Sequence, residues 1–167
     1  MLPSTKRITF RKFEDTAHDH ELVFQLNSNA QVMQYIGNPK SRSDAQEDLK
    51  RYLRYYHEHP GYGYLMAMIG AEQSFVGWYV VKLLPETLEP EIGYRLLPEF
   101  WNQGLATEGA AACLKYGFDK MKFSRMVAVA NPLNKGSIKV LEKLGMQYQH
   151  TGTYYQTECA YYCIKNE

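Results

Sequence analysis

The sequence has no long apolar run and almost no net charge, and each shortage narrows what the protein can be. No stretch approaches the roughly 20 apolar residues of a membrane span, and the opening MLPSTKRITF lacks the apolar run of a signal peptide. Nineteen Lys and Arg stand against eighteen Asp and Glu, whereas duplex-binding proteins carry a stronger basic excess. These features predict a soluble cytoplasmic protein that binds neither membrane nor nucleic acid.

The sequence also has few cysteines and histidines at the spacings that disulfides or metal sites need. The sequence contains three cysteines, Cys113, Cys159 and Cys163. Their odd number and the lack of a Cys-x-x-Cys spacing speak against a disulfide framework and a zinc site, so we expect buried thiols. Two histidine pairs, in 18–20 and 57–59, have no third ligand at a fitting spacing. We therefore expect surface histidines and no metal.

What the chain does contain is enough apolar sequence for one folded domain. It has 167 residues, of which 45% are hydrophobic, so we expect a single domain over residues 1–167. Alternating and buried-strand patterns predict strands at 7–13, 64–69, 74–84, 90–97, 125–130, 146–151 and 159–164. Helical spacing predicts helices at 18–27, from Ser43 to Pro60, at 105–121 and at 137–144. The result is one mixed α/β sheet.

Two details of these helices are predicted more closely. Ser43, with Gln46 three residues later, forms a capping-box pattern at the start of the second helix. Gly109 and Gly117 lower the helix propensity of the third. We therefore expect a neighbouring element to approach that helix closely at both glycines.

The stretch EFWNQGLATEGA, residues 99–110, joins a strand to a helix and is a candidate anion site. A helix N-terminus presents unpaired N–H groups and the positive end of its dipole. The P-loop pattern fails because Leu105 and Ala106 follow Gly104 where Lys and Ser or Thr are needed. The dinucleotide pattern Gly-x-Gly-x-x-Gly is absent as well. Taken alone, the stretch is equally compatible with a plain turn into a helix.

Three segments together carry a family resemblance: EIGYRL (91–96), FWNQGLATEG (100–109) and NKGSIKVLEKLGM (134–146). In this order and spacing they resemble the GNAT superfamily of acyl-CoA-dependent N-acetyltransferases. The similarity is greatest to the branch that includes the bacterial ribosomal-protein N-terminal acetyltransferases, and it covers nearly the whole chain. It implies a mixed, mostly antiparallel sheet flanked by helices, with two strands splayed at an acetyl-CoA cleft. Trp101 departs from the family's usually polar residue at that position.

The resemblance implies acetyl-CoA as the cosubstrate and assigns its contacts. The pyrophosphate is expected on backbone N–H groups of Gln103, Gly104, Leu105, Ala106 and Thr107. The pantetheine arm is expected beside Leu96 and Leu97, and Pro98 ends the strand there. Asn134 and Ser137 are expected to contact the cofactor from the following helix. Simple capping of helix 137–144 is the alternative for these two residues.

A catalytic base is needed because an amine must be neutral to attack a thioester. Neutralising a lysine with a pKa of about 10.4 at pH 7 costs about 4.6 kcal/mol, whereas an α-amine with a pKa of about 8 costs about 1.4 kcal/mol. A modest base, acting directly or through water, is therefore enough for an α-amine. Glu91 aligns with the glutamate that precedes Ile-Gly-Tyr in relatives and is the candidate; a solvent-facing strand carboxylate is the alternative. Glu89 is less favoured.

The proton donor to the departing thiolate is less clear. Leu141 stands where many superfamily members have a tyrosine, so the resemblance leaves Ser137 as the substitute. Tyr94 and Tyr148 are held in reserve. A backbone N–H near Leu96 or Leu97 is expected to stabilise the oxyanion.

We therefore predict transfer of an acetyl group to a primary amine, most simply a protein or peptide N-terminal α-amine. A small-molecule amine acceptor and a catalytically idle acetyl-CoA-binding module are the alternatives, and we expect either a monomer or a homodimer. Tyr35, Tyr56, Tyr154 and Tyr155 are the candidates to line the acceptor cleft. The tyrosine-rich segment 52–64 either packs a helix against a strand or walls that cleft.

Overall fold

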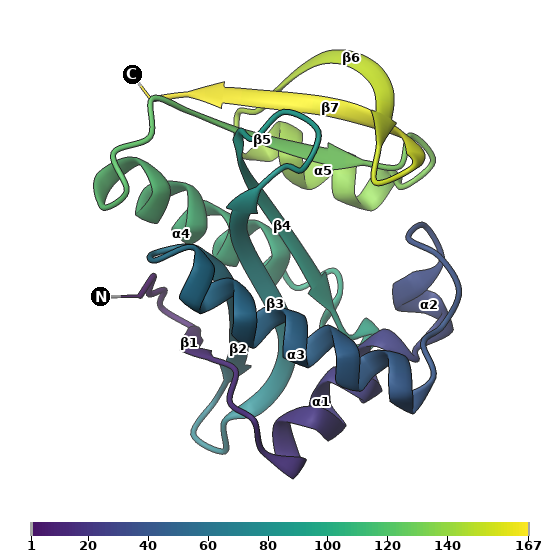
Figure 1. Ribbon diagram of the computed structural model, residues 1–167. Helices are drawn as coiled ribbons and strands as arrows, with labels where there is room; N and C mark the ends of the chain where they lie inside the picture. Colours follow the sequence, from purple (N-terminus) through teal and green to yellow (C-terminus); the bar gives the residue numbers. More distant parts are fainter. Residues whose placement is uncertain (1, 167) are drawn as a thin grey trace.

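The fold is one seven-stranded sheet with helices on both faces (Figure 1). The computed structural model describes residues 2–166. The strands are β1 (Ile8–Lys12), β2 (Gly63–Ile69), β3 (Ser74–Leu83), β4 (Pro90–Leu96), β5 (Arg125–Ala130), β6 (Gln147–Tyr154) and β7 (Thr157–Lys165). The α-helices are α1 (Ala17–Asn27), α2 (Ala30–Met33), α3 (Arg42–Glu58), α4 (Leu105–Asp119) and α5 (Lys135–Lys143). The spatial order of the strands is β1-β2-β3-β4-β5-β7-β6, and the parallel pair β4–β5 among antiparallel pairs makes the sheet mixed, as predicted.

The sheet comes apart between β4 and β5. These two strands are parallel, and in the described residues their register contains the single pair Glu91–Val127. The neighbouring pairs β3–β4 and β5–β7 are antiparallel ladders that continue along the strands. Beyond Glu91 and Val127, therefore, β4 and β5 run on toward Leu96 and Ala130 without pairing, and Figure 1 shows them diverging. The predicted splay is confirmed.

Each face of the sheet has its own hydrophobic core. Helices α4 and α5 cover one face, where Ile92 and Leu96 of β4 are buried. Helices α1, α2 and α3 cover the other, where Trp78 and Leu97 are buried. Because side chains alternate along a strand, successive residues of β4 point to opposite faces. The side chains of β4 are thus divided between the two cores.

Helix α4 lies against the sheet at its two glycines, as predicted. A Cβ atom on Gly109 would lie 2.2 Å from Cζ of Tyr79, and one on Gly117 would lie 2.3 Å from Sδ of Met126. Neither distance is sterically possible. The phenol of Tyr79 donates a hydrogen bond of 2.7 Å to the carbonyl oxygen of Leu105, which fixes the first turn of the helix on the sheet.

Two helix starts differ from the prediction. Helix α3 is capped by Ser41 in a capping box with Asp44, two residues before the predicted pair Ser43 and Gln46. The N–H of Lys40 donates to the carbonyl of Asn27 at 2.9 Å, so the chain is tied to the end of α1 just before this start. Helix α5 begins at Lys135 and not at Ser137. The short helix α2 was not predicted.

The tyrosine-rich segment packs helix α3 against β2. The rings of Tyr52 and Tyr64 stack with their centroids 3.8 Å apart. The hydroxyl of Tyr56 donates to the carbonyl of Tyr64 and accepts from the N–H of Phe13 at 3.0 Å. The packing interpretation of this segment is thus confirmed. None of the helices described between residues 2 and 166 is long and apolar enough to cross a membrane.

Candidate active site

The loop after β4 delivers a helix N-terminus to the edge of the splay. A 3₁₀ turn over Pro98–Phe100 leads to Asn102 and Gly104, which have φ angles of 58° and 77°. Gly104 is the N-cap of α4 and has no side chain to cap it. Because α-helical hydrogen bonds begin with the N–H of Glu108 onto Gly104, 3.0 Å away, the preceding N–H groups have no intrahelical partner. These groups, on Leu105, Ala106 and Thr107, fit an anion such as a pyrophosphate.

Arg7, at the start of β1, holds this loop in place. Its Nη1 donates to the carbonyl of Gln103 at 2.9 Å, and its Nε lies 2.6 Å from Oε2 of Glu108. Burial raises the pKa of Glu108, but hydrogen bonds from Thr5 and Arg7 outweigh burial and hold the pKa below its usual value. Glu108 therefore stays ionised and anchors Arg7 beside the uncapped helix. The local sequence around Arg7 carries no pattern that predicts this contact.

Leu96 and Leu97 present different backbone groups to the splay. The N–H of Leu97 donates to the carbonyl of Val76 on β3 at 2.9 Å, so it is already used. Backbone groups point alternately to the two sides of a strand. The N–H of Leu96 therefore points away from β3, toward the edge of β4 that is no longer paired with β5. The carbonyl of Leu96 faces the same way, because it accepts from Nε1 of Trp101 at 2.8 Å. Of the two candidate oxyanion donors, the geometry retains Leu96 and removes Leu97.

Across the splay, Ser137 lies within reach of Tyr94. The hydroxyl of Tyr94 donates to Oγ of Ser137 at 3.4 Å. Burial raises the pKa of Tyr94, while the contact with Ser137 lowers it by less. Asn134 caps α5, because its Oδ1 accepts from the N–H of Ser137 at 3.1 Å. Leu141, one turn after Ser137 on α5, is buried in the same core and has no hydroxyl to offer this pair.

Glu91 is a buried carboxylate and not the solvent-facing one considered as the alternative. Only 4% of the residue is exposed. Nζ of Lys82 lies 2.7 Å from its Oε2, and the hydroxyl of Tyr155 donates to the same oxygen. Nζ of Lys82 also lies 4.4 Å from the centre of the Tyr155 ring. Oε1 of Glu91 is therefore the oxygen left for an amine or a water molecule.

Tyr155 reaches Glu91 from a strained hairpin turn. Tyr155 and Gln156 link β6 to β7 with φ angles of 52° and 60°, a conformation that glycine and asparagine normally supply. The N–H of Tyr155 donates to Oε1 of Glu86 at 2.6 Å, which fastens the turn to the β3–β4 loop. Burial, followed by the Glu91 charge, raises the pKa of Tyr155, so its hydroxyl remains a donor. The sequence did not predict Lys82 because its partners come from β4 and from a distant turn.

Comparison with known proteins identifies the family to which the chain belongs. The family model described as "Acetyltransferase (GNAT) domain" matches residues 7–147. The chain belongs to the GNAT acetyltransferase family. It is an acetyl-CoA-dependent N-acetyltransferase of the GNAT type, and relatives from Bacillus subtilis are named N-acetyltransferases.

Individual relatives agree along nearly the full length. The acetyltransferase is 34% identical over 154 residues to the uncharacterized protein YkkB of Bacillus subtilis, covering 88% of this chain and 86% of the relative. A GNAT acetyltransferase structure from Bacillus anthracis has a TM-score of 0.81 and 30% identity, covering 99% of this chain and 98% of the other. Spermidine N-acetyltransferase from Vibrio cholerae, crystallised with CoA and spermine, has a TM-score of 0.78 at 17% identity with 96% of both chains covered, and shares the fold.

The tyrosines predicted to contact the acceptor fall into two groups in the structure. Two are exposed, and two have their hydroxyls engaged by other groups of the protein. Tyr35 is 37% exposed after α2, and Tyr155 is exposed over Glu91. Tyr56 is instead a framework residue, because backbone groups of Phe13 and Tyr64 occupy its hydroxyl. Tyr154 is 7% exposed and its hydroxyl is 2.8 Å from Nε2 of His150. Tyr56 and Tyr154 are therefore omitted from the acceptor site proposed below.

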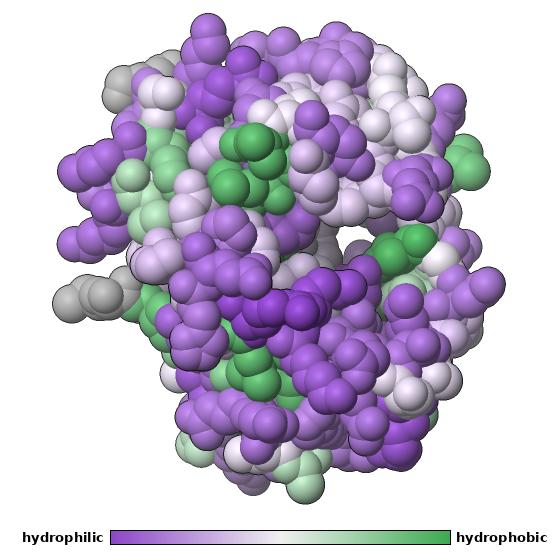
Figure 2. Space-filling model, in the orientation of Figure 1, coloured by the Kyte–Doolittle hydropathy of each residue, from purple (hydrophilic) through white to green (hydrophobic). Residues whose placement is uncertain are grey.

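The molecular surface has an opening (Figure 2). It lies between the part of the molecule containing β5–β7 and α5 and the part containing α1–α3. The loop after α2 borders it on the right of the view.

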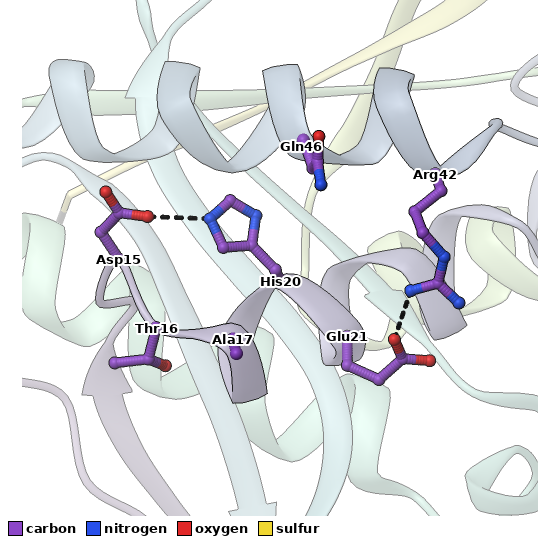
Figure 3. A pocket seen from close by; sticks show the side chains of 7 residues that line it. All are labelled: Asp15, Thr16, Ala17, His20, Glu21, Arg42 and Gln46. Carbon is purple, nitrogen blue, oxygen red and sulfur yellow. Dashed lines mark hydrogen bonds and ion pairs between the residues drawn. The ribbon is translucent and has the colours of Figure 1, made fainter.

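A second hollow, between the beginnings of α1 and α3, is separate from this site (Figure 3). It is lined by Asp15, Thr16, Ala17, His20, Glu21, Arg42 and Gln46. Nε2 of His20 lies 2.8 Å from Oδ1 of Asp15, and Arg42 pairs with Glu21, so both of these carboxylates already have partners. No residue of β4 or α4 belongs to its lining. In residues 2–166, no three His, Cys, Asp or Glu side chains gather as metal ligands would.

Proposed function

We propose that this GNAT acetyltransferase moves the acetyl group of acetyl-CoA to the α-amine at a protein or peptide N-terminus, as in the ribosomal-protein branch. The observation that carries the cofactor assignment is the uncapped N-terminus of α4 at the open end of the β4–β5 splay. Backbone N–H groups of residues 103–107 would hold the pyrophosphate. Leu96 and Leu97 would border the pantetheine arm, and Asn134 and Ser137 would contact it from α5.

The surroundings of Glu91 support an α-amine acceptor. Lys82 and Tyr155 both occupy Oε2, so Oε1 alone is free to take a proton, directly or through water. An α-amine needs about 3 kcal/mol less than a lysine side chain to become neutral at pH 7. A carboxylate with one free oxygen therefore suits an α-amine better than a lysine or a polyamine.

The remaining steps fall to groups on both sides of the splay. Acetyl-CoA supplies the thioester carbon that the neutral amine attacks. The N–H of Leu96 would stabilise the oxyanion, a role in which one fixed donor contributes about 3 to 4 kcal/mol. As the carbon–sulfur bond breaks, Ser137 would pass a proton to the thiolate and regain one from Tyr94, whose hydroxyl already donates to it. Solvent would then return a proton to Tyr94.

An acceptor screen with labelled acetyl-CoA tests this function. The acceptors are a peptide with a free N-terminus and no lysine, the same peptide with a blocked N-terminus and one added lysine, spermidine and an aminoglycoside. We expect label on the free α-amine and release of CoA thiol. Label only on lysine, spermidine or the aminoglycoside would contradict an α-amine acceptor. Thermal stabilisation by acetyl-CoA without transfer to any of them would instead indicate an idle binding module.

A further inference from the structure

Within residues 2–166, an arginine on the acceptor face of β4 has no carboxylate partner. No carboxylate in this range lies within ion-pairing distance of Arg95. Its Nη1 donates to Oδ1 of Asn27 at 3.1 Å, and its guanidinium lies 5.1 Å from the Trp78 ring. Arg95 is only partly exposed. A partly buried cation with one neutral acceptor retains unused donors and an unneutralised charge.

The groups around Arg95 hold it but do not neutralise it. Asn27 is fully buried, and its Nδ2 donates to Oδ2 of Asp48 at 2.8 Å. The other oxygen of Asp48 is taken by Arg51 at 2.8 Å. Asp48 thus forms its ion pair with Arg51. The contact of Asp48 with Nδ2 of Asn27 leaves the amide oxygen of Asn27 directed toward Arg95. This chain of contacts fixes the direction of the guanidinium.

A second donor beside Arg95 is also unused. Trp78 pairs with Arg95 across β3 and β4, and it is 6% exposed. In the described part of the chain, Nε1 of Trp78 is buried without a hydrogen-bond partner. Burying an indole N–H without a partner is costly. Arg95 and Trp78 are thus neighbouring side chains that both carry donors without an anionic partner in the described residues.

Arg95 and Glu91 lie on the same strand, β4, four residues apart. Both side chains lie on the face covered by α1–α3, with Gly93 between them on the same face. Gly93 adds no side chain, and a Cβ there would lie 3.3 Å from Val80. Four residues of strand separate the two Cα atoms by about 13 Å. β5 has parted from β4 along this length.

We propose that Arg95, with Nε1 of Trp78, binds a carboxylate of the acceptor, so that the preferred acceptor is a peptide N-terminus with Asp or Glu at its second or third residue. This inference rests on the proposed function, because it takes a peptide N-terminus as the acceptor. The reacting amine would lie at the thioester beside Leu96, and a carboxylate on the second or third residue of the peptide would reach Arg95 from there.

Paired peptides that differ only by Glu or Gln at positions two and three test the proposal. In the wild-type protein we expect kcat/KM to be about 10- to 100-fold higher for the Glu peptide, the range of a charged hydrogen bond. Arg95→Gln should reduce kcat/KM for the Glu peptide to the level of the Gln peptide. Arg95→Glu should favour a peptide with Lys at the same positions. Arg42→Gln, which removes the same charge from the surface of α3, is the matched control and should keep the preference.

Binding measurements distinguish failure of the Arg95 assignment from failure of the proposed function. Affinity of each peptide is measured by calorimetry in the presence of CoA, with melting temperature as a check on folding. Acetylation of both peptides with equal kcat/KM would overturn the Arg95 assignment and leave the function standing. Tighter binding of the Glu peptide by wild type than by Arg95→Gln, without any acetylation, would keep the Arg95 contact and refute the function. An equal loss for both peptides in Arg95→Gln would show a purely structural residue.

Discussion

At the scale of single residues, Glu91 illustrates how much its surroundings matter. The sequence presents two nearby carboxylates, Glu91 in the predicted strand and Glu89 just before it. Glu91 is held by Lys82 and Tyr155, whereas Glu89 pairs with Arg125, with Nε 3.0 Å from Oε1, and accepts from the hydroxyl of Tyr161. Only Glu91 lies beside the point where β4 and β5 separate. The structure thus distinguishes two carboxylates that spacing alone ranks only weakly.

Replacing Glu91 by Gln removes the proposed base and keeps the shape of the side chain. We expect kcat to fall by about 10²- to 10⁴-fold, as for loss of a general base. The pH profile of kcat should change shape, because the proposed proton acceptor is gone. The measurements are initial rates from pH 5 to pH 9 and the acetyl-CoA dissociation constant, which should stay nearly constant.

Glu89→Gln is the matched control for this substitution. It changes the same atoms two residues earlier, on a carboxylate paired with Arg125, and should leave the pH profile intact. An unchanged rate in Glu91→Gln at every pH would remove Glu91 as the base.

At the scale of elements, helix α4 and its loop show which contacts position the cofactor site. Gly109 has no room for a Cβ because the ring of Tyr79 fills the space. We expect Gly109→Ala to lower the free energy of unfolding by about 1 to 3 kcal/mol, the cost of overpacking a core. Urea denaturation measures the difference.

The α5 glycine Gly136 provides the comparison for Gly109. The nearest atom to a Cβ there is Oδ1 of Asn134 at 3.7 Å, which is ordinary contact. Gly136→Ala should therefore leave the stability unchanged or raise it by up to about 1 kcal/mol. Equal losses in the two variants would mean that the Tyr79 contact does not limit residue 109.

The loop before α4 depends on Arg7 of a different element. Arg7→Gln removes the ion pair with Glu108 and weakens the contact with the carbonyl of Gln103. We expect the acetyl-CoA dissociation constant to rise about 3- to 10-fold, because the loop must then be ordered on binding. Calorimetric titration with acetyl-CoA measures it.

Lys115→Gln is the control at the opposite end of the same helix. It breaks a surface ion pair with Asp119 and should not change acetyl-CoA affinity. If both variants bind acetyl-CoA like the wild type, Arg7 does not organise the cofactor site.

Some element boundaries cannot be predicted from the local sequence alone. Strand β5 and the close approach at Gly109 and Gly117 are as predicted, because a short apolar run favours a buried strand and helical glycines favour close packing. The start of α3 is different. Ser41 and Ser43 are both followed three residues later by a capping partner. The hydrogen bond from Lys40 to Asn27 lies outside either local pattern and accompanies the earlier start.

At the scale of the whole molecule, the splay between β4 and β5 joins two functions. One side of β4 faces the α4 and α5 core and the proposed cofactor contacts, and the other, which carries Arg95, faces the core beneath α1–α3. Cofactor and acceptor can therefore approach the same strand from opposite faces. A cytoplasmic location and a monomeric or homodimeric state stay predictions.

The sequence by itself determined the family, the mixed sheet and the helix that begins after Gly104. These follow from segments whose residues are neighbours in the chain, so periodicity and motif order are enough to find them. Only the tertiary structure decided what surrounds Glu91 and Arg95 and what anchors the α4 loop. Arg7 and Gln103 are 96 residues apart, and Arg95 and Asn27 are 68 apart. Such contacts arise from the packing of distant elements, and no local pattern of residues encodes them.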